Sequence, residues 1–195
     1  SSVQGNLITN MVFNSTSGST TAGGPWCGVY VSNGAVDIGG SVANFIGAIL
    51  GNGSISITAT NNATSTGIFI DGGTVHTIFN NNIGSINTIG TAAIAHGFTG
   101  IHVASAGSIT ISGNAIGSAA TANSINASFV TTSITNVPVV SGIVNVGASA
   151  AVITNNLIFN LGNAYLPTSA IGSTVLRGIY VSSGVNTITG NTIRN

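Results

Sequence analysis

The sequence predicts an all-β fold, a right-handed parallel β-helix. This is a solenoid of about five coils, each built from three short strands. Three observations lead to this fold class. A motif of Asn, any residue and Ile recurs six times. A Gly followed by an aliphatic residue precedes five of these motifs at a nearly constant distance, and the residues between the two alternate in polarity with a period of two. One such unit cannot bury its Ile face alone, but stacked units can.

The Asn-x-Ile motif marks one corner of every coil, and successive motifs are 33 to 42 residues apart. We expect Asn at this corner for two reasons. Asn tolerates the left-handed backbone conformation of tight turns, and its amide can stack on the amide of the next coil, as in the ladders of stacked strands. The expected Asn row consists of Asn6, Asn44, Asn81, Asn114, Asn156 and Asn191.

The Gly-aliphatic motif opens the constant half of each repeat, 13 to 16 residues before the Asn. In the stretch 178–195, Ile179 and Val181 share one face of a strand, whereas Ile188 faces away from its two Thr neighbours. Runs this short, separated by Gly, Ser or Asn, are typical of strands and turns rather than of helices. The repeat glycines are Gly28, Gly67, Gly100, Gly142 and Gly178.

The other part of each repeat varies in length and sequence. Because every variable segment joins the same two corners, we expect these segments to emerge as loops on one flank, where function in solenoids usually resides. The longest one alternates enough in polarity to add a strand of its own. The variable segments are residues 14–27, 50–66, 87–99, 118–141 and 162–177, and they hold Trp26, Cys27, His96, Pro138, Tyr165 and Pro167.

The repeats resemble the β-helix repeats of very large secreted surface proteins of Bacteroidetes-type bacteria, in which units such as GIYV (178–181) and NTITGNTI (186–193) run in long arrays. The resemblance covers essentially the whole chain. It implies an extracellular or cell-surface location, a role as an adhesin or filament, and export that is often by type IX secretion. Other β-helices are polysaccharide lyases, tailspikes or ice-binding proteins, so the fold by itself does not decide the function.

Charged residues are almost absent: two basic and two acidic residues give a formal net charge of zero. The sequence therefore does not favour nucleic acid or an anionic membrane surface as a partner. No apolar run approaches the roughly 18 residues of a membrane-spanning helix, so we expect no membrane insertion. The single cysteine, Cys27, excludes an internal disulfide and is expected to pack as a small hydrophobic residue.

A catalytic site is not expected, nor a cofactor. Glycosidases need two carboxyl groups roughly 5–10 Å apart, but Asp37 and Asp71 follow their repeat glycines at different offsets and are interpreted as solvated turn residues. The three histidines, His76, His96 and His102, also have different offsets. These different offsets argue against a three-His metal site, and the histidines are interpreted as surface or loop residues. Two separated Asp residues are too few for calcium.

The alternative from another functional class is a carbohydrate-binding or polysaccharide-degrading β-helix. A minor alternative is an ice-binding protein, because Thr187 and Thr189 flank Ile188 in a Thr-x-Thr pattern. The other repeats do not continue this pattern regularly. Our main expectation remains a non-catalytic structural or adhesive segment.

One outer stripe is the candidate contact surface. In the strand that follows each repeat Gly, the middle residue should point outward, and parallel stacking should place these residues about 4.8 Å apart per coil. In the fourth repeat, either Val144 or Asn145 takes this position. Variable loops could shelter the stripe, or a partner, filament or glycan could contact it. Its members are Tyr30, Phe69, His102 and Tyr180.

Self-association is the remaining expectation. With so few charges to prevent it, lateral association should occur and should depend little on salt. Residues 1–10 align with residues 186–195, so that Gly5 matches Gly190 and Asn6 matches Asn191. We therefore expect end-to-end stacking, with the 195 residues as an excerpt or a repeating subunit of a longer fibre. Glycans and host or cell surfaces are further candidate partners.

Overall fold

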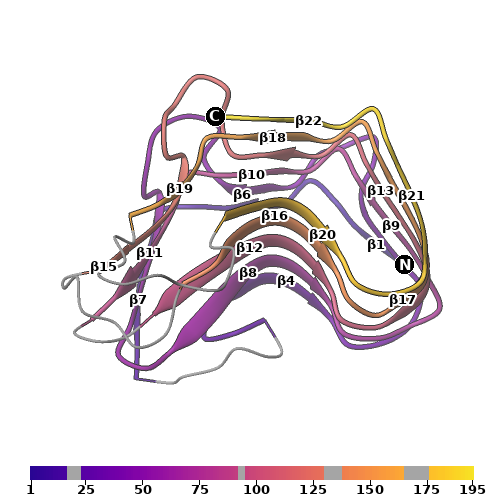
Figure 1. The fold of residues 1–195 in the computed structure, drawn as a ribbon, viewed down its shortest axis with the longest axis horizontal. Coiled ribbons are helices and arrows are strands. Elements are labelled where there is room, and N and C mark those ends of the chain that lie inside the picture. Colours follow the sequence, from indigo (N-terminus) through magenta and orange to yellow (C-terminus); the bar gives the residue numbers. More distant parts are fainter. Residues whose placement is uncertain (17–22, 92–94, 130–137, 165–175) are drawn as a thin grey trace.

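The structure is a computed structural model that describes residues 1–16, 23–91, 95–129, 138–164 and 176–195. The described residues form strands β1 to β22 and no helix, so they contain no helix able to span a membrane. Successive strands along the chain enter four parallel sheets in turn, which produces the stacked, four-sided outline in Figure 1. The prediction of an all-β parallel solenoid is confirmed, with five to six coils.

Two six-stranded sheets are formed by the constant half of the repeat. Sheet A contains β1 (Ser2–Val3), β5 (Val36–Gly39), β9 (Val75–Phe79), β13 (Ala106–Ser112), β17 (Ala148–Thr154) and β21 (Val185–Thr189). Sheet B contains β2 (Leu7–Ile8), β6 (Phe45–Gly47), β10 (Asn82–Gly84), β14 (Ala115–Ile116), β18 (Leu157–Phe159) and β22 (Thr192–Arg194).

Two five-stranded sheets complete the coils. Sheet C contains β3 (Met11–Ser15), β7 (Ile55–Ala59), β11 (Ile86–Gly90), β15 (Ile125–Phe129) and β19 (Leu161–Asn163). Sheet D contains β4 (Cys27–Val31), β8 (Ala63–Ile70), β12 (His96–Val103), β16 (Val140–Asn145) and β20 (Leu176–Val181). Each repeat glycine lies in a strand of sheet D.

A complete coil therefore has four strands, and the expectation of three was wrong. The missed strand belongs to sheet C, and it lies within or beside the segments interpreted as variable loops. The added strand expected in segment 118–141 is present as β15. Sheet C was missed although Ile55, Ile86 and Ile125 pair in register, because the segments around them vary in length and its next inward position does not repeat one residue type. Ile57, for example, pairs with Phe13 on one side and with Thr88 on the other.

Columns of Ile fill the interior because every sheet is parallel and in register. In sheet B, Ile46, Ile83 and Ile116 follow one another from coil to coil, and all three are fully buried. In sheet A, Ile38, Ile78, Ile111, Ile153 and Ile188 form a second column. Each fully buried Ile contributes roughly 1.5–3 kcal/mol, which a single coil could not gain without its neighbours.

The repeat glycines lie where sheet D packs directly against the Ile side chains of sheet B. A Cβ on Gly100 would be 2.8 Å from Cγ2 of Ile116 and 2.6 Å from the carbonyl oxygen of Gly142, so neither neighbour leaves room for a side chain. The strand pairing skips this glycine, and the strands of sheet D bend in the middle (Figure 1). Because Gly28, Gly67, Gly142 and Gly178 contact the Ile of their own coils in the same way, the Gly and Asn-x-Ile motifs recur in phase.

Candidate functional site

The six residues of the Asn row form one continuous column of hydrogen-bonded amides. From Asn6 to Asn191, the Nδ2 of each residue donates to Oδ1 of the next at 2.8–3.0 Å. The second Nδ2 hydrogen is also used: Asn114, for example, donates to the carbonyl oxygen of Ile78 at 2.8 Å. The four inner residues are fully buried with their polar atoms satisfied, which makes the row a structural element that links the coils.

We expected the row Asn itself to adopt the left-handed backbone conformation at this corner. In the structure, the residue before it does so instead. Asn80 and Asn155 have φ values of 57° and 55°, and glycines take the same position in three other coils, for example Gly113 at 66°. There is a physical reason why the turn residue and the row Asn are two different residues. A left-handed residue makes the turn, and the row Asn is then free to point its amide into the interior.

The outer stripe of sheet D is brought together in register. Tyr30, Phe69, His102, Val144 and Tyr180 pair from strand to strand, so Val144 takes the position that the sequence left open. Asn145 faces inward instead and donates to Asn186 Oδ1 at 2.9 Å.

The stripe is only partly available to a partner. Phe69 is 3% exposed: it stacks on Tyr30 with ring centroids 5.6 Å apart and meets the edge of His102 at 4.9 Å. Tyr30 and Tyr180 remain 46% and 39% exposed. Phe69 in the stripe is therefore covered by its neighbours, whereas the two tyrosines at the ends of the stripe stay accessible to a partner.

Beside the stripe lies a groove of about 270 Å³ on the outer face of sheet D. A second column of outward side chains forms part of its lining: Thr66, Thr99, Ser141 and Arg177 pair in register from β8 to β20. This column was missed in the sequence because it precedes the repeat Gly, at positions assigned to the variable segments. The groove is also lined by Gly23, Thr64, Phe69, His102, Val139, Val144, Val146 and Tyr180.

The charges near this groove lie toward its two ends. The Arg177 guanidinium lies over the Tyr180 ring, 4.6 Å from its centroid. Near the opposite end of the stripe, the Tyr30 hydroxyl donates to Asp71 Oδ2 at 2.6 Å, and this hydrogen bond raises the pKa of Tyr30. Burial lowers the pKa of His102, which keeps its ring neutral at pH 7, and its Nε2 is buried without a hydrogen-bond partner.

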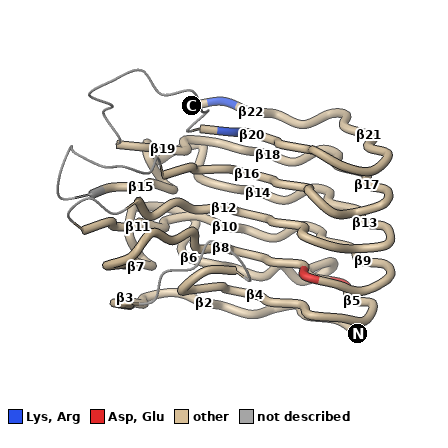
Figure 2. Tube along the Cα trace, turned by 60° about the horizontal axis from the view of Figure 1, so that its bottom comes forward, with Lys and Arg blue, Asp and Glu red and all other residues tan. Residues whose placement is uncertain are grey.

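The two carboxylates lie on different faces of the solenoid. Asp37 is a strand residue of β5 on the outer face of sheet A, where Thr77 donates a hydrogen bond to it. Asp71 follows β8 and accepts from Tyr30. Figure 2 shows acidic residues (red) toward the end of the stack that holds the N-terminus, and basic residues (blue), in β20 and β22, toward the other end. The expectation of turn residues was therefore wrong for Asp37.

Two of the histidines are interior residues, which corrects their interpretation as surface or loop residues. His76 is 1% exposed and donates from Nε2 to the carbonyl oxygen of Gly72 at 3.0 Å. His96 is equally buried, its Nε2 lies 2.9 Å from Ser65 Oγ, and desolvation lowers its pKa to about 4. Among the described residues, no three His, Cys, Asp or Glu side chains come together as a metal site.

Cys27 is a half-buried free thiol next to the buried Trp26. Burial raises the pKa of Cys27 to about 12, so the thiol is protonated at neutral pH and a poor nucleophile. Pro138 is also buried, and its carbonyl oxygen accepts a hydrogen bond from Asn163 at 2.8 Å. Tyr165 and Pro167 fall outside the residues that the structure describes.

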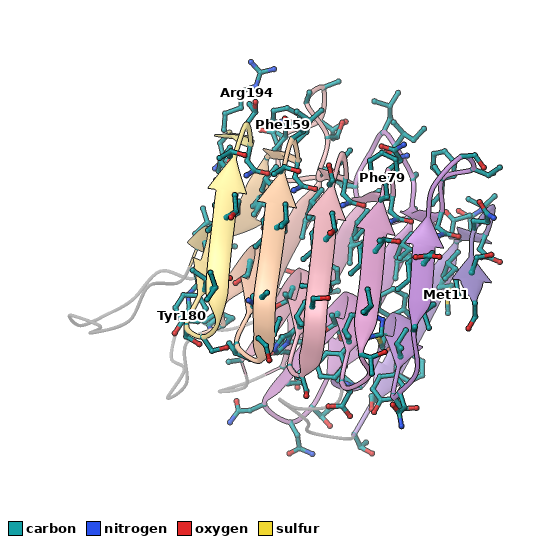
Figure 3. All side chains as sticks on the ribbon, turned by 90° about the vertical axis from the view of Figure 1, so that its right-hand side faces the viewer. Met11, Phe79, Phe159, Tyr180 and Arg194 are labelled. Atoms are coloured by element: carbon teal, nitrogen blue, oxygen red, sulfur yellow. The ribbon has the colours of Figure 1, made fainter. Side chains whose placement is uncertain are left out.

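The outer face of sheet A holds the Thr-x-Thr pattern that suggested ice binding (Figure 3). Thr187 continues in register to Val152, Thr110, Thr77 and Asp37, and Thr189 continues to Thr154, Ser112, Phe79 and Gly39. Val152 and Asp37 interrupt the first column, and Phe79 and Gly39 interrupt the second. The face therefore does not present a regular Thr array.

Comparison with known protein families, with curated proteins and with solved structures finds no match to this chain in any of the three.

Proposed function

We propose that this chain is a non-catalytic structural segment of an extracellular bacterial surface protein or filament, in which the stacked coils serve as a stiff scaffold. The observation that carries the proposal is the unbroken amide row from Asn6 to Asn191. It hydrogen-bonds every coil to the next through the interior, in addition to the sheet hydrogen bonds. A chain whose repeated residues all serve stacking is suited to bearing load and spanning distance.

The surface location is supported by the resemblance of the repeats to those of large secreted bacterial surface proteins. An adhesive role is supported by the outer face of sheet D, where the two exposed tyrosines, Tyr30 and Tyr180, can contact another surface.

The main alternative is a β-helix that degrades polysaccharides. It is disfavoured because Asp37 lies in sheet A whereas Asp71 follows strand β8 of sheet D, and each is already hydrogen-bonded to a hydroxyl group. A pair of carboxyl groups in one cleft, as glycoside hydrolysis requires, is not formed by these two residues.

A turnover assay separates the two functions. The purified chain is incubated with a panel of acidic and neutral polysaccharides, and the release of reducing or unsaturated ends is measured over time. We expect no release above the background of a heat-denatured sample. Sustained turnover that is lost in Asp37→Asn or Asp71→Asn would contradict the non-catalytic role.

The location is tested on intact cells of the producing bacterium. An antibody against the chain should label unpermeabilised cells or extracellular filaments, and brief external protease treatment should remove the label. Labelling that requires permeabilisation would contradict a surface role.

A further inference from the structure

The groove on the outer face of sheet D combines a column of hydroxyl-bearing residues with a largely apolar side. One side presents the hydroxyl groups of Thr66, Thr99 and Ser141, which pair in register on three successive strands. The other side is largely apolar, with Phe69, Val144 and the Tyr180 ring in the next paired column. From β8 to β20 the groove spans three strand spacings, about 14 Å.

Several polar groups in this groove have unused hydrogen-bonding capacity. His102 Nε2 is buried and has no partner. Thr66 and Ser141 line the groove although each is only 1% exposed, and a hydroxyl group can both donate and accept a hydrogen bond. Buried polar groups normally have partners, so an occupant with many hydroxyl groups would complete this surface.

The formal charge of the groove points to an anionic occupant. Among the described residues that line it, Arg177 is the one with a permanent charge, and its guanidinium contacts the Tyr180 ring. A guanidinium presents a planar fork of donors that matches a carboxylate in a bidentate geometry. His102 is neutral at pH 7, so it adds no second positive charge that could attract the anion away from Arg177.

We propose that this groove binds an oligosaccharide that carries a carboxylate, with the sugar hydroxyls toward the Thr66–Thr99–Ser141 column, an apolar ring face against the exposed Tyr180 ring, and the carboxylate on Arg177. A nucleic acid fits less well, because its repeated phosphates call for several cations. An extended peptide fits less well too, because the outer face of a paired sheet offers no free backbone groups for strand addition.

This inference goes beyond the structural role and does not depend on it. A scaffold without a glycan site would still be a scaffold, so failure of the binding test leaves the proposed function untouched.

The test uses the whole purified chain on an array of immobilised oligosaccharides. The array contains uronic-acid and sialic-acid members together with their carboxyl-reduced, neutral counterparts. We expect at least one acidic member to bind at least tenfold more tightly than its neutral counterpart. No binding to any acidic member, or equal binding to the reduced forms, overturns the proposal.

Two pairs of variants assign the binding to this groove. Arg177→Gln should weaken binding of the acidic member at least tenfold and leave weak neutral binding unchanged. Arg194→Gln is the matched control, because Arg194 also lies over an aromatic ring, that of Phe159 at 4.9 Å, and does not line the groove. Thr99→Val should weaken binding several-fold and Thr99→Ser should restore it, with unchanged thermal unfolding. Equal loss in both arginine variants, or no loss in either, places the binding elsewhere and refutes the assignment.

Discussion

Asn114 shows why this corner needs an amide rather than another small polar side chain. Its Oδ1 accepts from the backbone N–H and from Nδ2 of Asn81, and its Nδ2 donates to Asn156 Oδ1 and to the carbonyl oxygen of Ile78. Donor and acceptor must both be present on one side chain, and they must point in opposite directions along the stack. An aspartate keeps the acceptors and loses the donors.

Asn114→Asp is expected to destabilise the protein by about 3–5 kcal/mol at pH 7, because it places an unpaired charge among carbonyl oxygens in the interior. The cost should shrink as the pH falls toward about 4, because burial raises the pKa of the folded carboxyl above its unfolded value and the protonated carboxyl can donate one hydrogen bond. Urea unfolding of variant and wild type at pH 7 and pH 3.5 measures both effects.

The control for this change is Asn82→Asp, at the residue that directly follows the row residue Asn81. Asn82 belongs to the strand β10 and is only half-buried. Its substitution should cost less than about 1 kcal/mol, as for most surface substitutions. Equal costs for Asn82→Asp and Asn114→Asp would mean that the amide row does not hold the coils together.

The repeat glycines are required by close packing, and Gly100 is the clearest case. Gly100→Ala should destabilise the protein by about 3 kcal/mol, since the new Cβ would overlap both Ile116 and the Gly142 carbonyl oxygen. Gly51→Ala is the comparison: this glycine has φ +85° with nothing within 4 Å, so only backbone strain of about 1–2 kcal/mol is expected.

A double-mutant cycle with Ile116→Ala separates overlap from strain. Removing the Ile side chain relieves one of the two clashes, so the double variant should be less destabilised than the sum of the single variants. Strict additivity in thermal or urea unfolding would argue that Gly100 and Ile116 do not meet.

At the scale of elements, the pair formed by β8 and β12 carries an acid-sensitive contact. His96 at the start of β12 pairs its Nε2 with Ser65 Oγ of β8, and burial keeps the ring neutral by lowering its pKa from 6.5 to about 4. The unfolded chain therefore binds more protons than the folded chain between these two pH values. Stability is complete above about pH 6.5 and falls as the pH drops toward 4.

The expected loss attributable to His96 is about 3 kcal/mol over this range. His102 acts in the same direction, because burial also lowers its pKa. His96→Gln should remove most of the pH dependence even if it lowers stability at pH 7. The measurement is the free energy of unfolding in urea at intervals from pH 7 to pH 4. A slope as steep in His96→Gln as in the wild type would contradict the assignment.

Three of the four sheets could be predicted from the sequence and one could not, and the difference lies in how regularly their packing contacts recur. Sheets A, B and D could be expected because Asn, Gly and Ile are each required by a contact that recurs in every coil. Sheet C was missed although Ile55, Ile86 and Ile125 form a buried column in it, because the chain around this column varies in length and the second inward position changes from Ile57 to Thr88 and Ala127. The groove was hidden for the same reason: the Thr66–Thr99–Ser141 column contains no invariant residue.

At the scale of the whole molecule, the charge distribution governs association. Four charged side chains are spread over the chain, and exposed apolar residues such as Leu7, Ile49 and Leu50 lie on its surface. Attraction between molecules should then come from apolar and hydrogen-bonding contacts. Light scattering at high protein concentration is expected to detect association that changes little between low and high ionic strength. Strict monomers, or dissociation by moderate salt, would oppose this view.

The stacked-coil scaffold is tested most directly by pulling single molecules from their two ends. Strand pairs join only successive coils, and the exceptions are two loop hydrogen bonds, from Gly51 and Asn52 to Thr121 and Ala122, that bridge two coils across a third. We therefore expect extension in steps of one coil or whole multiples of it. The coils measure 33 to 42 residues along the Asn row, and each should release about 12–15 nm of chain. In Asn114→Ala the step that includes the central coils should occur at a lower force. Smooth stretching without steps, or an Asn114→Ala trace identical to the wild type, would contradict a scaffold held together by its amide row.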